Sequence, residues 1–286
     1  MTQNMPQKQK TKLVPVLREP ALLTERDAGK SPVLECIDLG ITFGGLKAVD
    51  NFNVTIGRTE ITGLIGPNGA GKTTVFNLLT KVYQPTHGTI LLNGKDIHDL
   101  NTAQVNRAGI ARTFQNIRLF GELSVEENIT VAMDTQMHYT MPEGIFRLPR
   151  FWKEERIVHE RAMELLSIFH MEDLAKAKAS SLPYGAQRRL EILRALATNP
   201  SLLLLDEPAA GMNPSETAEL MENIRSIRDT FKIAVLLIEH DMNLVMNICE
   251  GIAVLNFGHV IAKGTPEDIQ NNPEVIEAYL GKQKEA

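Results

Sequence analysis

Unbroken apolar runs along the chain predict buried β-strands. Residues 61–65, 202–205 and 234–238 are dominated by aliphatic side chains. Strands of a parallel sheet that helices cover on both faces have this composition, because neither face meets water. Between the last two runs, Asn213 followed by Pro214 is typical of a helix start, and this helix would form the crossover between parallel strands. The pattern therefore predicts an α/β core.

Alternating positions near the start of the chain predict a second kind of sheet. Residues 52–56 alternate apolar and polar side chains, and residues 89–92 lead into Asn93-Gly94, a dipeptide typical of a hairpin turn. We expect a β-rich block that begins at about Val33 and pairs its strands in antiparallel fashion.

The middle of the chain has the period of helices. Ser124 with Glu127 three residues later forms a capping box, and residues 156–169 and 187–198 place apolar side chains on one face. Residues 134–153 hold prolines, a glycine and the single tryptophan, Trp152, which indicates an irregular segment. This segment is either a surface loop or a docking surface for a partner. A helical insert over about residues 116–200 is therefore expected to interrupt the α/β core.

Composition narrows the class of protein. The chain has 286 residues, 43% hydrophobic and 23% charged, which is ordinary for a globular protein. The net charge of −5 gives no overall basic field for nucleic acid. Two distant cysteines favour a reducing compartment, and no apolar run approaches the roughly 20 residues of a membrane span. The N-terminus lacks the apolar region of a secretory signal, and residues 1–31 are expected to form a disordered tail.

The clearest chemical motif follows the first buried run. The sequence fits the phosphate-binding pattern G-x-x-x-x-G-K-S/T at every position. Lys72 is expected to reach the β- and γ-phosphates of a nucleotide, and the Thr73 hydroxyl to hold Mg²⁺. A strand before the loop and a helix after it are the context that this motif requires. The predicted binding residues of this loop are Gly66, Pro67, Asn68, Gly69, Ala70, Gly71, Lys72, Thr73 and Thr74.

Four further residues lie where neighbouring strands are expected to end. Asp206 and Glu207 follow the leucine run directly, so Asp206 is a candidate Mg²⁺ ligand and Glu207 a candidate to orient the attacking water. His240 follows the next strand and can hydrogen-bond a γ-phosphate, although a purely structural histidine is an equal alternative. Gln115 begins the helical insert, and its amide can reach Mg²⁺ or the attacking water. Together they predict nucleotide hydrolysis.

These motifs together resemble the ATP-binding cassette (ABC) proteins over about residues 33–281. The resemblance implies a P-loop, RecA-like α/β core with an antiparallel β subdomain and an inserted α-helical subdomain. It implies an ATPase domain over residues 32–286, with a C-terminal extension from about residue 263. It also implies that Phe43 stacks on adenine and that two cassettes share two ATP molecules. The residues that would contact ATP across such a dimer are Leu182, Pro183, Tyr184, Gly185, Ala186, Gln187 and Asn213.

The signature segment departs from the family's usual Leu-Ser-Gly-Gly-Gln. Pro183, Tyr184 and Ala186 stand where that form has Ser, Gly and Gln. Loss of the serine hydroxyl removes one hydrogen bond to a charged group, of about 1.5–3 kcal/mol. Gly185 and the helix N-terminus remain, so binding across the dimer is still expected. The sequence leaves open whether this site hydrolyses ATP at the full rate.

The Tyr-Gly signature, together with Phe43-Gly44-Gly45 and the C-terminal Glu277-Ala278-Tyr279-Leu280, is similar to ATPase subunits of bacterial branched-chain amino-acid importers. This resemblance implies ATP and Mg²⁺ as cofactors, a second ATPase subunit, two integral membrane permease subunits and, indirectly, an extracytoplasmic substrate-binding protein, with no nucleic acid. The place implied is the cytoplasmic face of the inner membrane. ATPases of urea or short-amide importers and of lipopolysaccharide export, and cassette proteins outside transport, remain alternatives.

Overall fold

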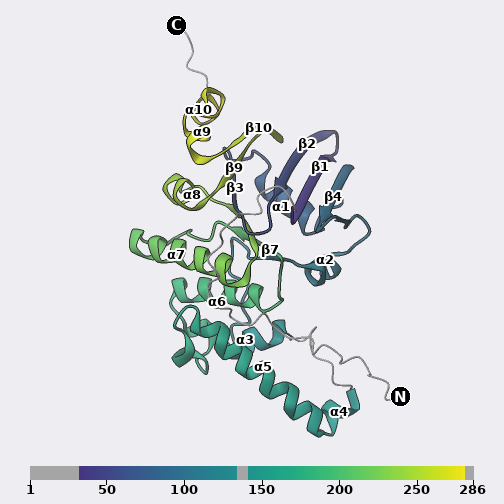
Figure 1. Ribbon diagram of the computed structural model, residues 1–286, viewed down its shortest axis with the longest axis vertical. Helices are drawn as coiled ribbons and strands as arrows, with labels where there is room; N and C mark the ends of the chain where they lie inside the picture. The colour runs from purple at the N-terminus through teal and green to yellow at the C-terminus, as the bar shows by residue number, and fades with distance from the viewer. Residues whose placement is uncertain (1–31, 134–140, 281–286) are drawn as a thin grey trace, which may run out of the picture.

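The computed structural model describes residues 32–133 and 141–280, which form two sheets and a group of helices (Figure 1). The strands are β1 (Leu34–Phe43), β2 (Leu46–Ile56), β3 (Ile61–Ile65), β4 (His87–Leu92), β5 (Lys95–Asp96), β6 (Ile110–Arg112), β7 (Leu202–Asp206), β8 (Ala234–Ile238), β9 (Gly251–Asn256) and β10 (His259–Gly264). The helices are α1 (Lys72–Leu79), α2 (Thr102–Ala108), α3 (Val125–Ala132), α4 (Met141–Ile145), α5 (Pro149–Ser167), α6 (Tyr184–Leu196), α7 (Pro214–Phe231), α8 (Met242–Ile248), α9 (Pro266–Gln270) and α10 (Pro273–Leu280), with short 3₁₀ turns at Glu172–Leu174 and Ala179–Ser181.

The larger sheet is the predicted parallel core. Its strand order is β10-β9-β3-β8-β7-β6, and every pair except β10 with β9 is parallel. Side chains alternate between the two faces of a strand. Leu202 and Leu204 of β7 accordingly lie in a first hydrophobic core, which they share with the antiparallel sheet. Leu203 and Leu205 lie in a second core, which they share with helices. This double burial explains why the run is apolar at every position.

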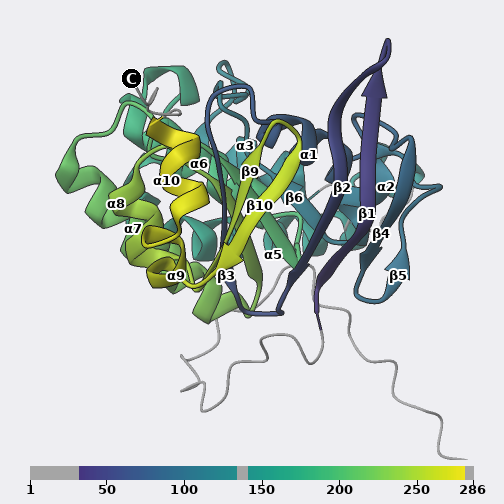
Figure 2. The same cartoon turned by 90° about the horizontal axis from the view of Figure 1, so that it is seen from above.

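The smaller sheet is antiparallel, in the order β2-β1-β4-β5, and stands beside the parallel sheet (Figure 2). Its apolar side chains share one core with α1, which contributes Val75 and Phe76, and with one face of β7 and β8. The predicted hairpin after β4 is present, since Leu92 pairs with Lys95 across Asn93-Gly94. The expected fold, a P-loop α/β core with an antiparallel sheet and inserted helices, is confirmed.

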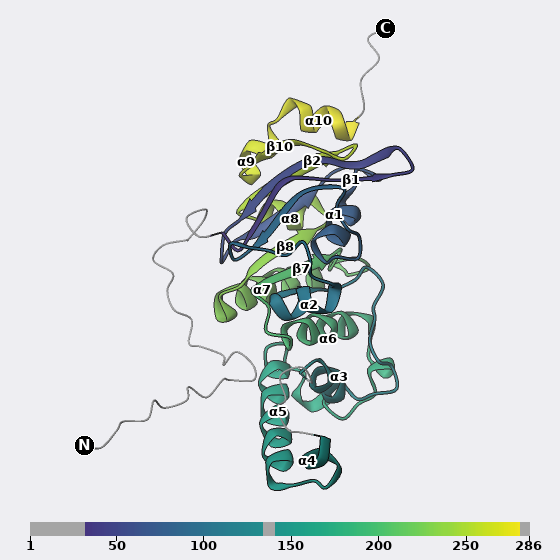
Figure 3. The same cartoon turned by 90° about the vertical axis from the view of Figure 1, so that its right-hand side faces the viewer.

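Helices α3, α5 and α6 follow β6 and precede β7 in the sequence. In space they lie together and form a helical layer (Figure 3). α5 buries Val158, Ala162, Leu165 and Leu166 against the second core, as its period predicts. The capping box at the start of α3 is present in both directions. Ser124 Oγ accepts from the Glu127 amide at 3.2 Å, and Glu127 Oε2 accepts from the Ser124 amide at 2.7 Å. The division of the chain into subdomains at residues 116 and 200 stays a prediction.

The interpretation of residues 134–153 as irregular is wrong for the part that the structure describes. Residues 141–145 form α4, and α5 begins at Pro149 rather than near residue 156. The prolines that suggested a loop stand at helix starts, where a missing N–H costs nothing. Residues 134–140 lie outside the described residues, as do the predicted tail over residues 1–31 and the last six residues, 281–286. Among the described residues, no helix has both the length and the apolar character that a bilayer span needs.

The double burial of β7 predicts a large cost for truncating its side chains. Leu203 is 1% exposed, so Leu203→Ala is expected to lower the free energy of unfolding by about 2–5 kcal/mol through lost contacts and a cavity. Urea unfolding followed by circular dichroism measures the change. Leu46→Ala, at a side chain that is 71% exposed, is the matched control and should change stability by less than about 0.5 kcal/mol. Equal effects at the two positions would contradict this packing.

Candidate functional site

The predicted phosphate-binding loop leaves the end of β3 and enters α1 at Lys72. Two of its glycines have no room for a side chain. A Cβ on Gly66 would lie 2.0 Å from the Leu255 carbonyl oxygen, and one on Gly71 would lie 2.8 Å from that of Ala48. Gly71 also has a φ of +106°, which side-chain-bearing residues rarely adopt. The loop is therefore packed against the two sheets, and no side chain caps the α1 N-terminus that it leads into.

Lys72 lies across this loop. Its Nζ donates to the Gly66 carbonyl at 2.6 Å and to the Pro67 carbonyl at 3.0 Å, and the residue is only 7% exposed. Burial lowers the pKa of Lys72, whereas the nearby carboxylates of Glu207 and Asp206 act to raise it. A buried ammonium beside an uncapped helix N-terminus favours a bound anion with several negative charges. Two threonines follow at the start of α1: Thr73 is exposed and Thr74 is half-buried.

The C-terminal helix supports the same loop, which the sequence did not indicate. Tyr279 of α10 lies near the Gly66 amide, which acts to lower the pKa of the Tyr279 hydroxyl, whereas burial, the larger effect, raises it. A tyrosine on a short amphipathic helix can serve many purposes. Its place beside the phosphate-binding loop is therefore visible only in the fold.

Three predicted catalytic residues meet at one carboxylate. Glu207 follows β7, and its Oε2 accepts from Gln115 Nε2 at 2.9 Å, while Oε1 lies 3.2 Å from His240 Nε2. The Glu207 amide donates to the Ile238 carbonyl at 2.9 Å, which ties the residue to the end of β8. Its φ of +48° is unusual for a residue with a side chain and is typical of functional sites. The arrangement holds one carboxylate between an amide and an imidazole.

Asp206 has a partner that sequence reasoning missed. Arg112, the last residue of β6, donates from Nη2 to Asp206 Oδ2 at 2.7 Å, and both side chains are buried. Arg112 Nη1 donates to Asn77 Oδ1 at 2.7 Å, and the guanidinium lies over the rings of Phe76 and Phe114. Adjacent parallel strands end at the same edge of a sheet. This rule was the one feature of the sequence from which a contact between Arg112 and Asp206 could have been predicted. Arg112 therefore positions the candidate metal ligand.

Glu239 is a second missed residue. It is 4% exposed, and its carboxylate accepts from the Ala209 amide at 2.7 Å and from the His240 amide at 3.0 Å. Burial raises the pKa of Glu239, while these backbone donors act to lower it. The carboxylate thus joins the segment after Glu207 to the segment that carries His240. A buried acid between two candidate catalytic residues was visible in the sequence, but its partners were not.

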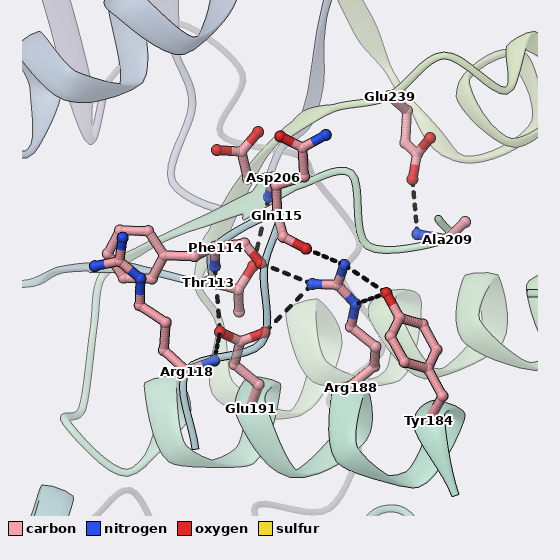
Figure 4. Close-up of polar contacts among 10 residues, drawn as sticks. All are labelled: Thr113, Phe114, Gln115, Arg118, Tyr184, Arg188, Glu191, Asp206, Ala209 and Glu239. Atoms are coloured by element: carbon pink, nitrogen blue, oxygen red, sulfur yellow. Dashed lines mark hydrogen bonds and ion pairs between the residues drawn. The ribbon is translucent and has the colours of Figure 1, made fainter. Parts of the chain in front are cut away.

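The segment that carries Gln115 is held by α6 (Figure 4). Arg188 donates to the Phe114 carbonyl at 2.7 Å and to the Gln115 carbonyl, and it is 3% exposed. Glu191, 2% exposed, accepts from the Phe114 amide at 3.3 Å and the Arg118 amide at 3.4 Å. Burial is the main cause of the raised pKa of Glu191. Two opposite charges one helical turn apart therefore fix the backbone on both sides of Gln115.

The signature segment overlaps the start of α6. The sequence had suggested that this helix begins only after the segment, at residue 187. Pro183 is the N-cap residue, and Tyr184 begins the helix. Tyr184 Oη accepts from Arg188 Nη2 at 2.9 Å, a pair four residues apart on one face. A Cβ on Gly211, after β7, would lie 3.4 Å from the Tyr184 ring. The tyrosine thus connects the signature to two other segments of its own chain.

The predicted contacts across a dimer divide into buried and exposed residues. Ala186 is 4% and Leu182 6% exposed, and both lie in the second core, so their side chains pack inside this chain. That burial favours a small apolar residue at position 186. Gln187 Nε2 donates to the Leu182 carbonyl at 2.8 Å. Asn213 caps α7, where its Oδ1 accepts from the Ser215 and Glu216 amides. Pro183, Tyr184 and Asn213 are exposed and Gly185 and Gln187 are half-buried, so these five can meet a second subunit.

Phe43 ends β1 and is 43% exposed. Its ring meets that of Tyr83 edge-on, with centroids 5.2 Å apart. Tyr83 follows α1, and its amide donates to the Asn77 carbonyl at 3.1 Å, so the aromatic pair lies beyond the end of the helix that the loop begins. The pair offers an exposed aromatic face, and its role toward adenine stays a prediction.

The oxygen donors suit Mg²⁺ better than a soft metal. Within residues 32–133 and 141–280, no three acidic, histidine or cysteine side chains gather into a metal site. Mg²⁺ usually takes one or two carboxylates and completes its shell with water and phosphate oxygens. Asp206, Thr73 and Gln115 offer such a set. Arg112 engages Oδ2 of Asp206, and a carboxylate has about four lone-pair positions, so the same group can also serve a cation.

Comparison with known proteins identifies relatives over most of the chain. The family model described as ABC transporter matches residues 49–210, and the one described as branched-chain amino acid ATP-binding cassette transporter matches residues 259–285. High-affinity branched-chain amino acid transport ATP-binding protein BraF of Pseudomonas aeruginosa is 48% identical over 87% of this chain and 98% of its own length. LivG of Escherichia coli, with the same description, is 49% identical with the same coverage.

A solved structure is similar in fold as well as sequence. The ADP conformation of MJ1267, an ATP-binding cassette of an ABC transporter, superposes with a TM-score of 0.76 at 30% identity and covers 88% of this chain and 99% of that one. The lipopolysaccharide export system ATP-binding protein LptB of Haemophilus influenzae is 32% identical over 88% of this chain and 98% of its own length.

The contact between Tyr184 and Arg188 yields a test of how the Gln115 segment is held. Tyr184→Phe removes the hydroxyl that accepts from Arg188, and water can replace it in part. We therefore expect the free energy of unfolding to fall by about 1 kcal/mol. Amide hydrogen exchange of residues 113–118 should become faster, because Arg188 donates to the carbonyls there. Tyr83→Phe, on the far side of α1, is the control and should leave this exchange unchanged. Equal protection in both variants would contradict the proposed support.

Proposed function

The chain belongs to the ABC transporter family, and on this basis we propose that it is the ATP-hydrolysing subunit of an importer of branched-chain amino acids. The observation that carries the proposal is the carboxylate of Glu207, held by Gln115 and His240 at the strand edge next to the buried Lys72. The identity of 48–49% to two branched-chain amino-acid transport proteins supports the substrate class, as does the second family model, over residues 259–285.

Each residue has a task that follows from its position. The loop and Lys72 bind the phosphates of ATP, because the uncapped N-terminus of α1 and the buried ammonium beside it both favour an anion. Glu207 orients and polarises the water that attacks the γ-phosphorus, and Gln115 and His240 fix the direction of its carboxylate. His240 is also a donor for the γ-phosphate. Asp206, Thr73 and Gln115 would hold Mg²⁺, which neutralises part of the phosphate charge when bound.

A second ATPase chain completes the site. Pro183, Tyr184, Gly185 and Gln187 are the signature residues that are exposed or half-buried, at the N-terminus of a helix whose dipole favours a phosphate. The partner is a sister ATPase or a second copy of this chain, and the likeness to branched-chain importers favours the sister. Phe43 supplies the aromatic face for adenine.

A permease docks beside α6. A cavity of about 260 Å³ opens there between α2, β6, α3 and α6, with the half-exposed side chains of Phe120 and Val131 at its rim. Arg194 lies over the Phe120 ring, 5.6 Å from its centroid, and burial lowers the pKa of Arg194. Glu191 lines the same cavity and binds the backbone next to Gln115. A permease segment in this cavity would therefore sense the nucleotide site, with the ATPase at the cytoplasmic face of the membrane and an extracytoplasmic binding protein delivering substrate.

Export of lipopolysaccharide is the nearest alternative. LptB shares 32% identity, well below the values for the amino-acid transport proteins, and the family model over residues 259–285 is named for branched-chain amino acids. These two observations place the importer first.

Glu207→Gln tests the catalytic assignment. The amide keeps the shape and the contact with Gln115 but cannot polarise water, so phosphate release should fall by about 10²- to 10⁴-fold with nucleotide affinity nearly unchanged. Lys72→Ala should instead abolish binding of a fluorescent ATP analogue. Glu122→Gln is the control, since that side chain is 85% exposed and only pairs with Lys178 at the surface. Normal turnover by Glu207→Gln would remove Glu207 from this role.

Uptake measurements test the substrate class. A strain that lacks this chain should lose uptake of labelled leucine and keep uptake of labelled urea and glutamate, and the intact chain should restore it. Restoration by Glu207→Gln should fail, because the motor would bind ATP without completing the cycle. Loss of urea uptake instead would assign the chain to a different importer, and unchanged uptake of all three compounds would overturn the importer proposal.

A further inference from the structure

The junction of α4 and α5 has an unusual composition for this acidic protein. Residues 145–153, here called the α4–α5 tip, read Ile-Phe-Arg-Leu-Pro-Arg-Phe-Trp-Lys. They contain five apolar side chains other than proline and three basic ones but no acidic residue, in a chain with a net charge of −5. The tip comprises the last residue of α4, the connection, and the first turn of α5.

Four of the five apolar side chains of the tip are exposed. Phe146 is 74%, Ile145 71%, Trp152 57% and Leu148 44% exposed. The tip lies at the end of the molecule farthest from the two sheets, where α5 extends beyond the other helices (Figures 1 and 3). Solvent exposure of four large apolar side chains in one short segment is unfavourable in water and indicates a contact surface.

The basic groups are interleaved with the apolar ones. The Arg147 guanidinium lies over the Trp152 ring at 5.8 Å from its centroid, and Phe151 meets that ring edge-on at 5.4 Å. Arg150 pairs with Glu143 and Glu154. Within residues 32–133 and 141–280, neither Arg147 nor Lys153 forms an ion pair. The tip thus presents aromatic rings together with two cations that pair with no carboxylate of the described residues.

We propose that the α4–α5 tip contacts the anionic headgroups of the bilayer beside the permease, an inference that rests on the proposed function at a membrane. Tryptophan and phenylalanine enter the headgroup region with their rings, while arginine and lysine extend their charged ends to lipid phosphates. An apolar protein partner would have to bury the charges of Arg147 and Lys153 without supplying a counter-ion, which is costly. An anionic lipid surface satisfies both kinds of side chain at once.

The single tryptophan of the chain makes the contact directly measurable, because all tryptophan emission comes from Trp152. The full chain is titrated with phosphatidylcholine vesicles, with and without phosphatidylglycerol, at low and high salt. We expect a shift of the emission to shorter wavelength, and quenching by brominated acyl chains, with the phosphatidylglycerol vesicles at low salt. High salt should reverse both, since it screens the charges.

Two pairs of variants separate the apolar from the basic contribution. Ile145→Ser with Phe146→Ser, and Arg147→Glu with Lys153→Glu, should each weaken vesicle binding by at least about tenfold. Phe257→Ser, which removes an 82%-exposed phenylalanine in the β9–β10 turn, and Arg58→Glu with Lys95→Glu, which change the net charge equally, are the controls and should bind as the unaltered chain does.

ATP hydrolysis is measured on the same preparations, so that failure of the motor assignment and failure of the lipid contact are distinguished. Emission that stays constant at saturating phosphatidylglycerol, in a chain that hydrolyses ATP normally, would overturn the proposal and assign the tip to a protein partner. Equal binding to neutral vesicles, or undiminished binding after charge reversal at Arg147 and Lys153, would overturn it too.

Discussion

The position of the two candidate catalytic carboxylates depends on the burial of β7 on both of its faces. Leu202 and Leu204 fix one face against α1 and the antiparallel sheet, and Leu203 and Leu205 fix the other against the helices. Because all four residues are leucine, the register is set by the polar residues that flank them: a shift by one residue would bring Ser201 or Asp206 to a core position that a leucine now fills. Its end is therefore fixed in space, and Asp206 and Glu207 follow at that end. Pairing with β6 and β8 then places Arg112 beside Asp206, and ties the Glu207 amide to the Ile238 carbonyl.

The helical layer acts on this site through one buried ion pair. Arg188 and Glu191 lie on the same face of α6 and bond the backbone before and after Gln115 (Figure 4). Removal of one partner of a buried ion pair typically costs about 3–5 kcal/mol, because the other charge stays buried. These bonds attach residues 114–118 to α6, and Gln115 bonds Glu207 directly. The cavity lined by Glu191 and Arg194 lies on the same helix, so a partner bound there would act on the helix that holds the Gln115 segment.

Local patterns predicted the parts of the fold that local chemistry decides. The apolar runs, the capping box at Ser124, the helix start at Asn213-Pro214 and the phosphate-binding loop each depend on residues within one short segment. The roles of Arg112 and Glu239 were missed because their partners are distant in sequence and only the fold brings them together. The start of α5 at Pro149 was misread, since a proline marks a loop and a helix start equally well until the following turn is known.

The altered signature has a physical explanation within its own chain. A longer polar side chain at position 186 would have to enter the core that Ala186 fills, at a cost in desolvation and packing. The Tyr184 ring lies beside Gly211 of the segment after β7, and its hydroxyl accepts from Arg188, which in turn bonds the segment that holds Gln115. A glycine at position 184 could make neither contact. The departure from the usual form therefore removes a polar group that could bind the phosphate. In return, it strengthens the link between the signature and the hydrolysis site of the same chain. In a shared-site dimer, such a link joins the residues that face the partner's nucleotide to those that act on the chain's own.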